Sequence, residues 1–207
     1  MKRFATTLAA AALAASLCGT GGCQPESSGH KAATAATEIP ATAKGGAGES
    51  LPDDDVAEYQ PRWRSHRVDS TRYRKVFLAG TIDMGQSEDW QAAVIARFRD
   101  SVHGRWLFFN PRRKVFHATP EEMEYQVAWE LEHLEAADLI LMNLLGSGKS
   151  PVSLLELGLN ARSGRLRVAC DPAYYRYDNV RITCRHYGIP LYDSFDELLD
   201  HLTEDNN

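Results

Sequence analysis

The most constraining feature of this sequence is the alternation of short apolar runs with helical patterns between about residues 72 and 205. Short apolar runs between turn residues are typical of buried strands. They occur at 76–79, 106–109, 139–145, 166–170 and 189–192. Helical patterns lie at 89–102, 119–137, 150–161 and 195–202. Strands that alternate with helices imply crossover connections, and therefore a mostly parallel sheet with helices on both faces.

The alternation predicts a single α/β domain of the doubly wound, flavodoxin- or Rossmann-like kind, with about five mostly parallel strands. Such folds bind ligands beyond the carboxyl ends of their strands, where the strand order reverses. We therefore expect function to lie in residues 80–85, in residues 146–156 and in the segment after Cys170.

The first 22 residues differ from this pattern and predict an export signal. They begin with Lys2 and Arg3, continue as an Ala/Leu-rich apolar stretch and end in small residues. Gly22-Cys23 resembles the cleavage junction of bacterial lipoproteins, in which Cys23 would carry the lipid. Thr20 stands where such junctions usually have Leu, so plain secretion is the alternative. We expect an exported protein, either a membrane-anchored lipoprotein or a periplasmic or secreted one.

Residues 23–71 are rich in Ala, Thr, Gly, Ser and Pro, without a sustained apolar period. Such a segment buries too little apolar surface to offset its ordering entropy, so it predicts a flexible linker. The expected organisation is thus a signal peptide (1–22), a linker (23–71) and a folded domain (72–205).

Charge and cysteine usage narrow the function classes. The formal net charge of −5 gives no electrostatic footprint for nucleic acid. No apolar run has the ~18–20 residues of a membrane-spanning helix, so membrane contact is expected only through a lipid anchor. Cys170 and Cys184 either pair in an oxidising compartment or are two separate buried thiols. The histidines are scattered without metal-ligand spacing, so we expect neither metal nor cofactor.

Residues 145–150, Leu-Gly-Ser-Gly-Lys-Ser, follow an expected strand and open an expected helix, as a phosphate-binding P-loop does. That motif requires a glycine five residues before its Gly-Lys-Ser end, and Asn143 occupies this position. The loop therefore predicts only a generic anion or polar-ligand site at a helix N-terminus.

Two glutamates indicate function more specifically than this loop does. Glu156 is the only carboxylate in the apolar first half of its helix, and it is either functional, a surface residue or the far member of a capping pair with Ser153. Gly158 favours the close approach of another group. Glu130 lies on the helical stripe of Met123, Val127, Leu134 and Ala137, which should face the sheet. Burial would raise the pKa of Glu130, as suits a proton donor.

Several segments together resemble the nucleoside 2-deoxyribosyltransferases, in their divergent deoxyribosyltransferase-like branch. They are Phe77-Leu-Ala-Gly-Thr-Ile-Asp-Met-Gly, Asn110-Pro-Arg-Arg, residues 126–138, Ser150-Pro-Val-Ser-Leu-Leu-Glu-Leu-Gly and Tyr175-Arg-Tyr-Asp-Asn-Val. The resemblance extends over about 130 residues.

The resemblance implies cleavage or transfer at the N-glycosidic bond of a 2′-deoxynucleoside or nucleotide, by a retaining double displacement. Glu156 matches the nucleophile, and Glu130 falls where the family has an aspartate that protonates or contacts the base. Asn179 matches a residue that a neighbouring subunit contributes, which implies a homo-oligomer. The implied substrate-binding residues are Gly80, Asp83, Asp138, Ser150, Ser153 and Asn179.

This sequence departs from the family at two positions. Val76 stands where the family has a tyrosine that orients the nucleophile, and Ser150 replaces an acidic residue that binds the base. Two carboxylates suffice for retaining chemistry at an anomeric carbon without a metal. The alternative function is a non-catalytic nucleotide or nucleotide-sugar sensor on the same fold.

Overall fold

A computed structural model describes residues 55–62, 69–101 and 103–204. The predicted signal peptide, Cys23 and the predicted linker up to residue 54 lie outside the described residues, as does Val102. Within the described part of the chain, no helix is both long and apolar enough to cross a membrane.

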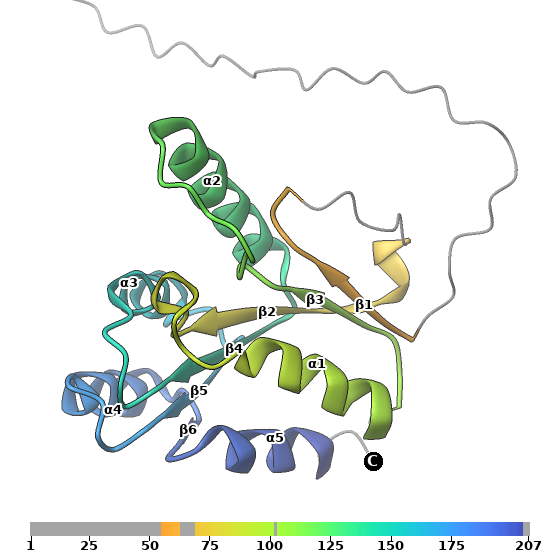
Figure 1. The fold of residues 1–207 in the computed structure, drawn as a ribbon. Helices are drawn as coiled ribbons and strands as arrows, with labels where there is room; N and C mark the ends of the chain where they lie inside the picture. Colours follow the sequence, from red (N-terminus) through yellow and green to blue (C-terminus); the bar gives the residue numbers. More distant parts are fainter. Residues whose placement is uncertain (1–54, 63–68, 102, 205–207) are drawn as a thin grey trace, which may run out of the picture. The chain divides into compact units, whose positions relative to one another are not determined.

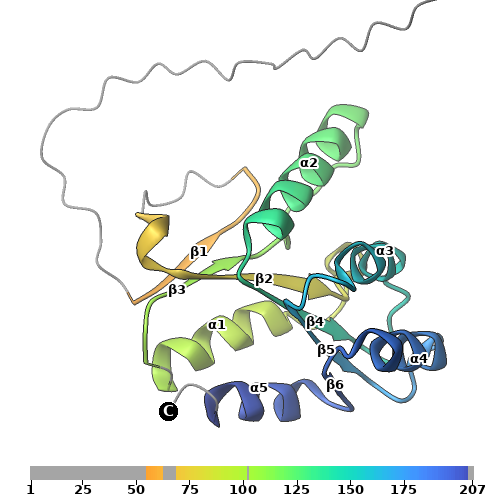
Figure 2. The same ribbon diagram turned by 180° about the vertical axis from the view of Figure 1, so that it is seen from behind.

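Six parallel strands form one sheet in the order β1-β3-β2-β4-β5-β6 (Figures 1 and 2). The strands are β1 (Val56–Tyr59), β2 (Arg74–Gly80), β3 (Trp106–Phe109), β4 (Leu139–Leu144), β5 (Leu166–Cys170) and β6 (Leu191–Tyr192). Without β1, the order is that of flavodoxin-like sheets, which reverses between β2 and β4. The α/β doubly wound prediction is confirmed, with six strands rather than about five.

Five α-helices connect and cover the strands (Figure 1). They are α1 (Trp90–Ser101), α2 (Pro120–Ala136), α3 (Pro151–Asn160), α4 (Tyr177–Tyr187) and α5 (Phe195–Glu204). Two 3₁₀ turns lie at Ser70–Arg72 and Asp83–Gly85. Thr119 caps α2, because its hydroxyl accepts a hydrogen bond from the Glu122 N–H at 3.3 Å.

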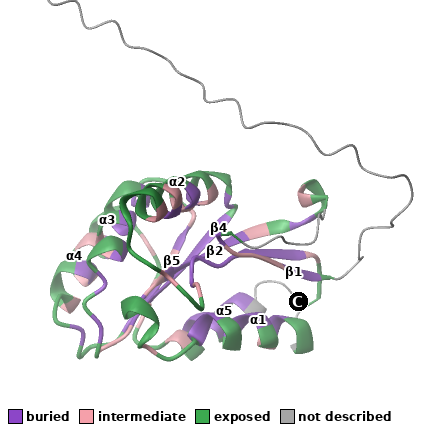
Figure 3. Cartoon of the chain, turned by 45° about the horizontal axis from the view of Figure 1, so that its top comes forward, coloured by how far each residue is buried: buried purple, intermediate pink, exposed green. Residues whose placement is uncertain are grey.

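The helices divide into two layers, each with its own apolar core. Trp129 and Leu134 of α2, Leu157 of α3 and Val180 of α4 pack on one face of the sheet. The opposite face is covered by α1 and α5. Figure 3 shows the consequence: the central strands are mostly buried, whereas the helices carry exposed residues on their outer sides.

Three predictions about the fold are corrected. The linker does not extend to residue 71, because Val56–Tyr59 form β1 and pair with β3 at the sheet edge. Helix α4 was not predicted. The prediction that one stripe of α2 faces the sheet is confirmed for Leu134, which is buried. It is wrong for Met123 and Val127, which are 42% and 44% exposed. Gln126 and Trp129 take the inward positions instead.

The open alternative for the cysteines is settled by the structure. Cys170 and Cys184 are free, buried thiols in the core beneath α4. Burial is the main cause that raises the pKa of both, to about 12 for Cys170 and about 11 for Cys184, so neither is a reactive thiolate near neutral pH.

Candidate active site

The carboxyl ends of β2 and β4 approach closely at the point where the strand order reverses. Gly80 ends β2 with φ 133°, and a Cβ at this position would lie 2.1 Å from the backbone oxygen of Asn143 on β4. Only glycine fits there. Sequence analysis placed Gly80 at the site, and the structure gives it the role of joining the two strand ends.

Thr81, the residue after Gly80, connects this strand end to the loop before α3. Its hydroxyl lies 2.7 Å from the hydroxyl of Ser150 and accepts a hydrogen bond from the Leu145 N–H at 3.0 Å. Its carbonyl accepts from the Trp90 indole N–H at 2.9 Å. Thr81 is fully buried and was not singled out from the sequence, since its partners are brought together only by the tertiary fold.

Ser150 and Ser153 orient α3 against β2. Ser150 is buried in a left-handed conformation (φ 43°), and its hydroxyl binds Thr81 rather than capping α3. Ser153 is also buried and donates a hydrogen bond to the Gly80 carbonyl at 2.9 Å. Because Glu156 follows Ser153 by three residues on α3, this contact fixes where Glu156 can lie.

Glu156 is 7% exposed, and no hydrogen bond from a described residue reaches its carboxylate. Burial, and after it the nearby charge of Glu130, raise the pKa of Glu156 to about 8. These surroundings favour the protonated form of Glu156 near neutral pH.

Glu130 lies on α2, within electrostatic reach of Glu156. Burial raises its pKa as predicted, whereas a hydrogen bond from the Gln126 amide at 2.9 Å acts in the opposite direction. The same amide donates to the Pro111 carbonyl at 3.0 Å. The charges of the two glutamates therefore influence each other, and ionisation of one disfavours ionisation of the other.

The segment after β2 brings Asp83 beside the loop before α3. Asp83 is exposed with φ 46°, and its carboxylate lies 3.0 Å from where a Cβ of Gly148 would stand. Within that loop the N–H groups of Leu145 and Gly148 are already bound, to Thr81 and to Leu145, and do not contribute to the predicted anion site.

Arg112 holds the Asp83 segment in place, and sequence analysis gave it no role. Its guanidinium donates to the backbone carbonyls of Gly85, Ser87 and Glu88 and to the Gln91 amide oxygen. It is 8% exposed. The Asn110-Pro-Arg-Arg segment quoted for the resemblance is the signal that could have found it.

Two predicted residues lie away from the glutamates. Asp138 lies at the amino end of β4, where its carboxylate accepts a hydrogen bond from the Lys75 N–H at 2.8 Å, so the structure does not bring it to the carboxyl ends of the strands. Asn179 is exposed and lines a groove of about 300 Å³ between α3 and α4. Within one chain it does not join the pair.

Val76, which stands at the position of the family's tyrosine, is fully buried in the core under α1 and α5. It therefore faces away from the glutamates, and the neighbouring Phe77 faces α2, with its ring 6.3 Å from that of Trp129.

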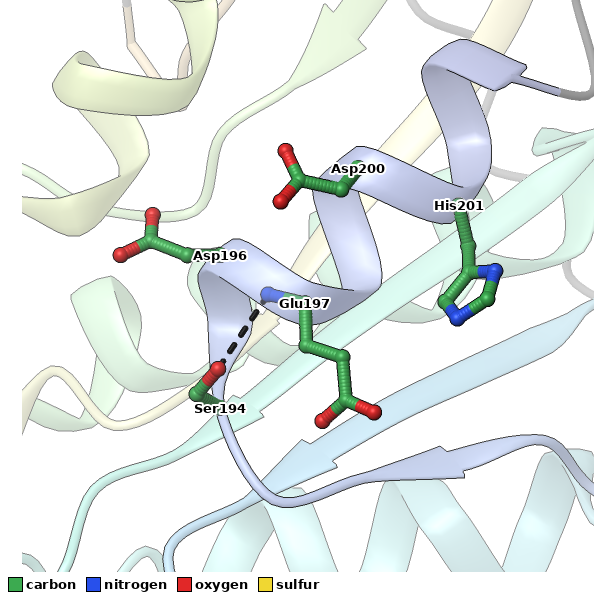
Figure 4. A pocket seen from close by; sticks show the side chains of 5 residues that line it. All are labelled: Ser194, Asp196, Glu197, Asp200 and His201. Carbon is green, nitrogen blue, oxygen red and sulfur yellow. Dashed lines mark hydrogen bonds between the residues drawn. The ribbon is translucent and has the colours of Figure 1, made fainter.

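A further hollow of about 420 Å³ lies on α5, lined by Ser194, Asp196, Glu197, Asp200 and His201 (Figure 4). Figure 4 shows that Asp196 and Asp200 project from one side of α5, whereas Glu197 and His201 project from the other. Among the described residues, no group of three His, Cys, Asp or Glu side chains could hold a metal ion.

Comparison with known proteins supports the same region. Residues 73–174 match the model of the family described as nucleoside 2-deoxyribosyltransferase like. The match extends from the start of β2 to just beyond β5 and includes both glutamates. No curated protein matches the chain.

Proposed function

We propose that the chain cleaves or transfers the N-glycosidic bond of a 2′-deoxynucleoside or nucleotide through a covalent glycosyl ester of Glu156. The premise is the family match of residues 73–174, which supports a function of the nucleoside-transfer type and the binding of a small nucleoside. The observation that carries the proposal is the buried Glu156 with the half-buried Glu130 within electrostatic reach of it.

In the first step the ionised Glu156 attacks the anomeric carbon while the bond to the base breaks, and Glu130 donates its proton to the leaving base. In the second step water, or another nucleobase, attacks the same carbon, releases Glu156 and returns a proton to Glu130. Two displacements retain the configuration of the sugar. The reactive form thus carries a proton on Glu130 and none on Glu156, and the positive charge that develops on the sugar stabilises the ionised Glu156.

The test is incubation of the purified chain with deoxynucleosides and deoxynucleotides, with and without a free base, reading the released or exchanged base. Exchange identifies a transferase, and release without exchange identifies a hydrolase. Glu156→Ala should abolish turnover, a loss of at least several kcal/mol in activation free energy. A 2-fluoro-2-deoxy sugar donor should leave an adduct on Glu156, detected by peptide mass. Turnover that survives Glu156→Ala would remove the nucleophile assignment.

Glu130→Gln keeps the shape of the side chain but removes the acid. It should slow the cleavage of poor leaving bases more than that of activated ones, because only the former need a proton to depart. An equal loss on both substrates would show that Glu130 only positions the ligand.

A second candidate function is a non-catalytic nucleotide-binding module. Two observations favour it. The pKa of Glu156 near 8 disfavours the ionised form that a nucleophile requires. Val76, at the position of the family's tyrosine, faces the other side of the sheet. Binding of nucleotides to wild type and Glu156→Ala alike, without turnover of any substrate, would establish this alternative.

We also propose that the chain is a homo-oligomer. The outer side of α3 carries Val152, Leu155 and Leu159, each at least 56% exposed, and the only charged residue of α3 is the buried Glu156. A helix that is apolar on its outer side is typical of one covered by a partner. In the arrangement that the resemblance implies, Asn179 of the partner subunit completes the site.

Export and lipidation at Cys23 stay part of the proposal. If Cys23 carries the lipid, Cys23→Ser should release the chain from membranes on fractionation. Unchanged membrane association of the variant would remove the lipid anchor.

A further inference from the structure

A cavity of about 490 Å³ lies on the opposite face of the sheet from the two glutamates. Helices α1 and α5 form its walls, and the ends of β4 and β5 form its floor. Its volume lies within the range of small-molecule sites, roughly 300–1,000 Å³. The chemistry proposed for Glu156 and Glu130 makes no use of this cavity.

Asn143, the polar residue of β4 that lines the cavity, has an unpaired side chain. It is 4% exposed, yet none of the hydrogen bonds between described residues uses its carboxamide. Side chains alternate along β4, and Leu139 and Leu141 pack in the core under α1 and α5, so Asn143 points to the same side. Because its atoms are not among the fully buried polar atoms of the described residues that lack a partner, the carboxamide is open to the cavity and can bind a ligand there.

The cavity combines this carboxamide with an apolar wall. Trp90 and Phe195 stand edge to face with ring centroids 4.9 Å apart, and Val94, Ala169 and Leu199 complete the apolar lining. A ligand with an apolar or aromatic body would bury that body here and place a polar group against Asn143.

The rim of the cavity is strongly acidic. The lining carboxylates are Glu88, Asp89, Asp171, Asp193 and Asp196. Arg97 is the only basic residue in the lining, and it forms ion pairs with Asp196 and Asp200. Such a rim attracts cations and repels anions. Because no three of the described carboxylates gather into a metal-binding group, the geometry does not suit a metal ion.

We propose that this cavity is a binding site for a small organic cation, an amine or guanidine with an apolar body. Its N–H groups would donate hydrogen bonds to the Asn143 carboxamide oxygen, its body would pack against Trp90 and Phe195, and its charge would be balanced by the acidic rim. The proposal stands independently of the deoxynucleoside chemistry, since it rests on other residues and is tested by binding alone.

The experiment is calorimetric titration of the full chain with 2-phenylethylamine, agmatine and putrescine, and with 3-phenylpropanoate as an anion of similar shape. At least one cation should bind with Kd below about 10 mM, and the anion should not. Asn143→Leu should raise that Kd at least about tenfold, because it removes the hydrogen-bonding group and keeps the size.

A surface variant tests the proposal even if Asn143→Leu, in the central strand, fails to fold. Glu88→Gln with Asp196→Asn removes two rim charges and should weaken binding about three- to tenfold, whereas Asp100→Asn with Glu132→Gln removes two exposed charges elsewhere and should not. The proposal is overturned if no cation binds up to about 10 mM, if the anion binds as tightly, or if the rim variant binds like its control.

Discussion

At the scale of single residues, the distinctive feature of the molecule is a buried and a half-buried carboxyl group, Glu156 and Glu130, within electrostatic reach of each other. Both pKa values are raised, and burial is the largest cause for each. The sequence predicts this for Glu130, because an inward glutamate beside Trp129 loses its water. The sequence does not predict the raised pKa of Glu156. The burial of this side chain depends on the hydrogen bonds of Ser150 and Ser153 with the residues at the end of β2.

The raised pKa of Glu156 makes stability depend on pH. The folded chain holds the Glu156 proton up to about pH 8, whereas the unfolded chain loses it near the ordinary value of 4.5. Within that window the folded state binds more protons, so the free energy of unfolding falls as the pH rises. Glu156→Gln lacks this titration and should exceed wild type in stability by up to a few kcal/mol near pH 8, with little gain near pH 5.

Urea denaturation of both proteins at the two pH values measures the difference. Glu132→Gln on the exposed side of α2 serves as the control and should show no comparable trend. A gain for Glu156→Gln that is equal at both pH values would contradict the assignment, because it would not arise from proton binding.

At the scale of elements, the sequence predicts those with a strong period and misses those that depend on neighbours. The bounds of β3 and β5 are confirmed to the residue. Strand β1 has only four residues between Asp55 and Gln60, and its place at the sheet edge is fixed by pairing with β3 rather than by its own pattern. Helix α4 did carry a signal, since Tyr177, Val180, Cys184 and Tyr187 follow a helical period.

The segment between β2 and α1 is an element that depends on one side chain. Arg112→Met keeps the length of the side chain but leaves the carbonyls of Gly85, Ser87 and Glu88 without this donor. We expect a loss of about 2–4 kcal/mol in the free energy of unfolding. We also expect faster proteolysis within residues 82–89, because the segment is no longer held to β3.

Thermal unfolding and limited proteolysis followed by mass spectrometry test this. Arg99→Met, on the exposed side of α1, should behave like wild type. Cleavage in 82–89 at the wild-type rate would show that other contacts hold the segment.

At the scale of the whole molecule, the apolar outer side of α3 predicts self-association. Leu155→Glu with Leu159→Glu places two charges on this surface and should convert an oligomer into monomers without changing the circular dichroism spectrum. Light scattering during size-exclusion chromatography gives the mass. Val115→Glu, at an exposed apolar residue that belongs to neither α2 nor α3, is the matched control. A monomeric wild type at about 0.1 mM would refute the oligomer.

The position of β1 at the edge of an all-parallel sheet has a consequence for the order of assembly. β1 pairs with β3 alone, and about 50 residues of chain separate Val56 from its partner Trp106. Although β1 precedes the other strands in the chain, loop closure lets it dock only after β2, α1 and β3 have come together. It should therefore join the sheet late, and its amide hydrogens should exchange with solvent sooner than those of the central β4. The first strand in sequence is then among the last to fold.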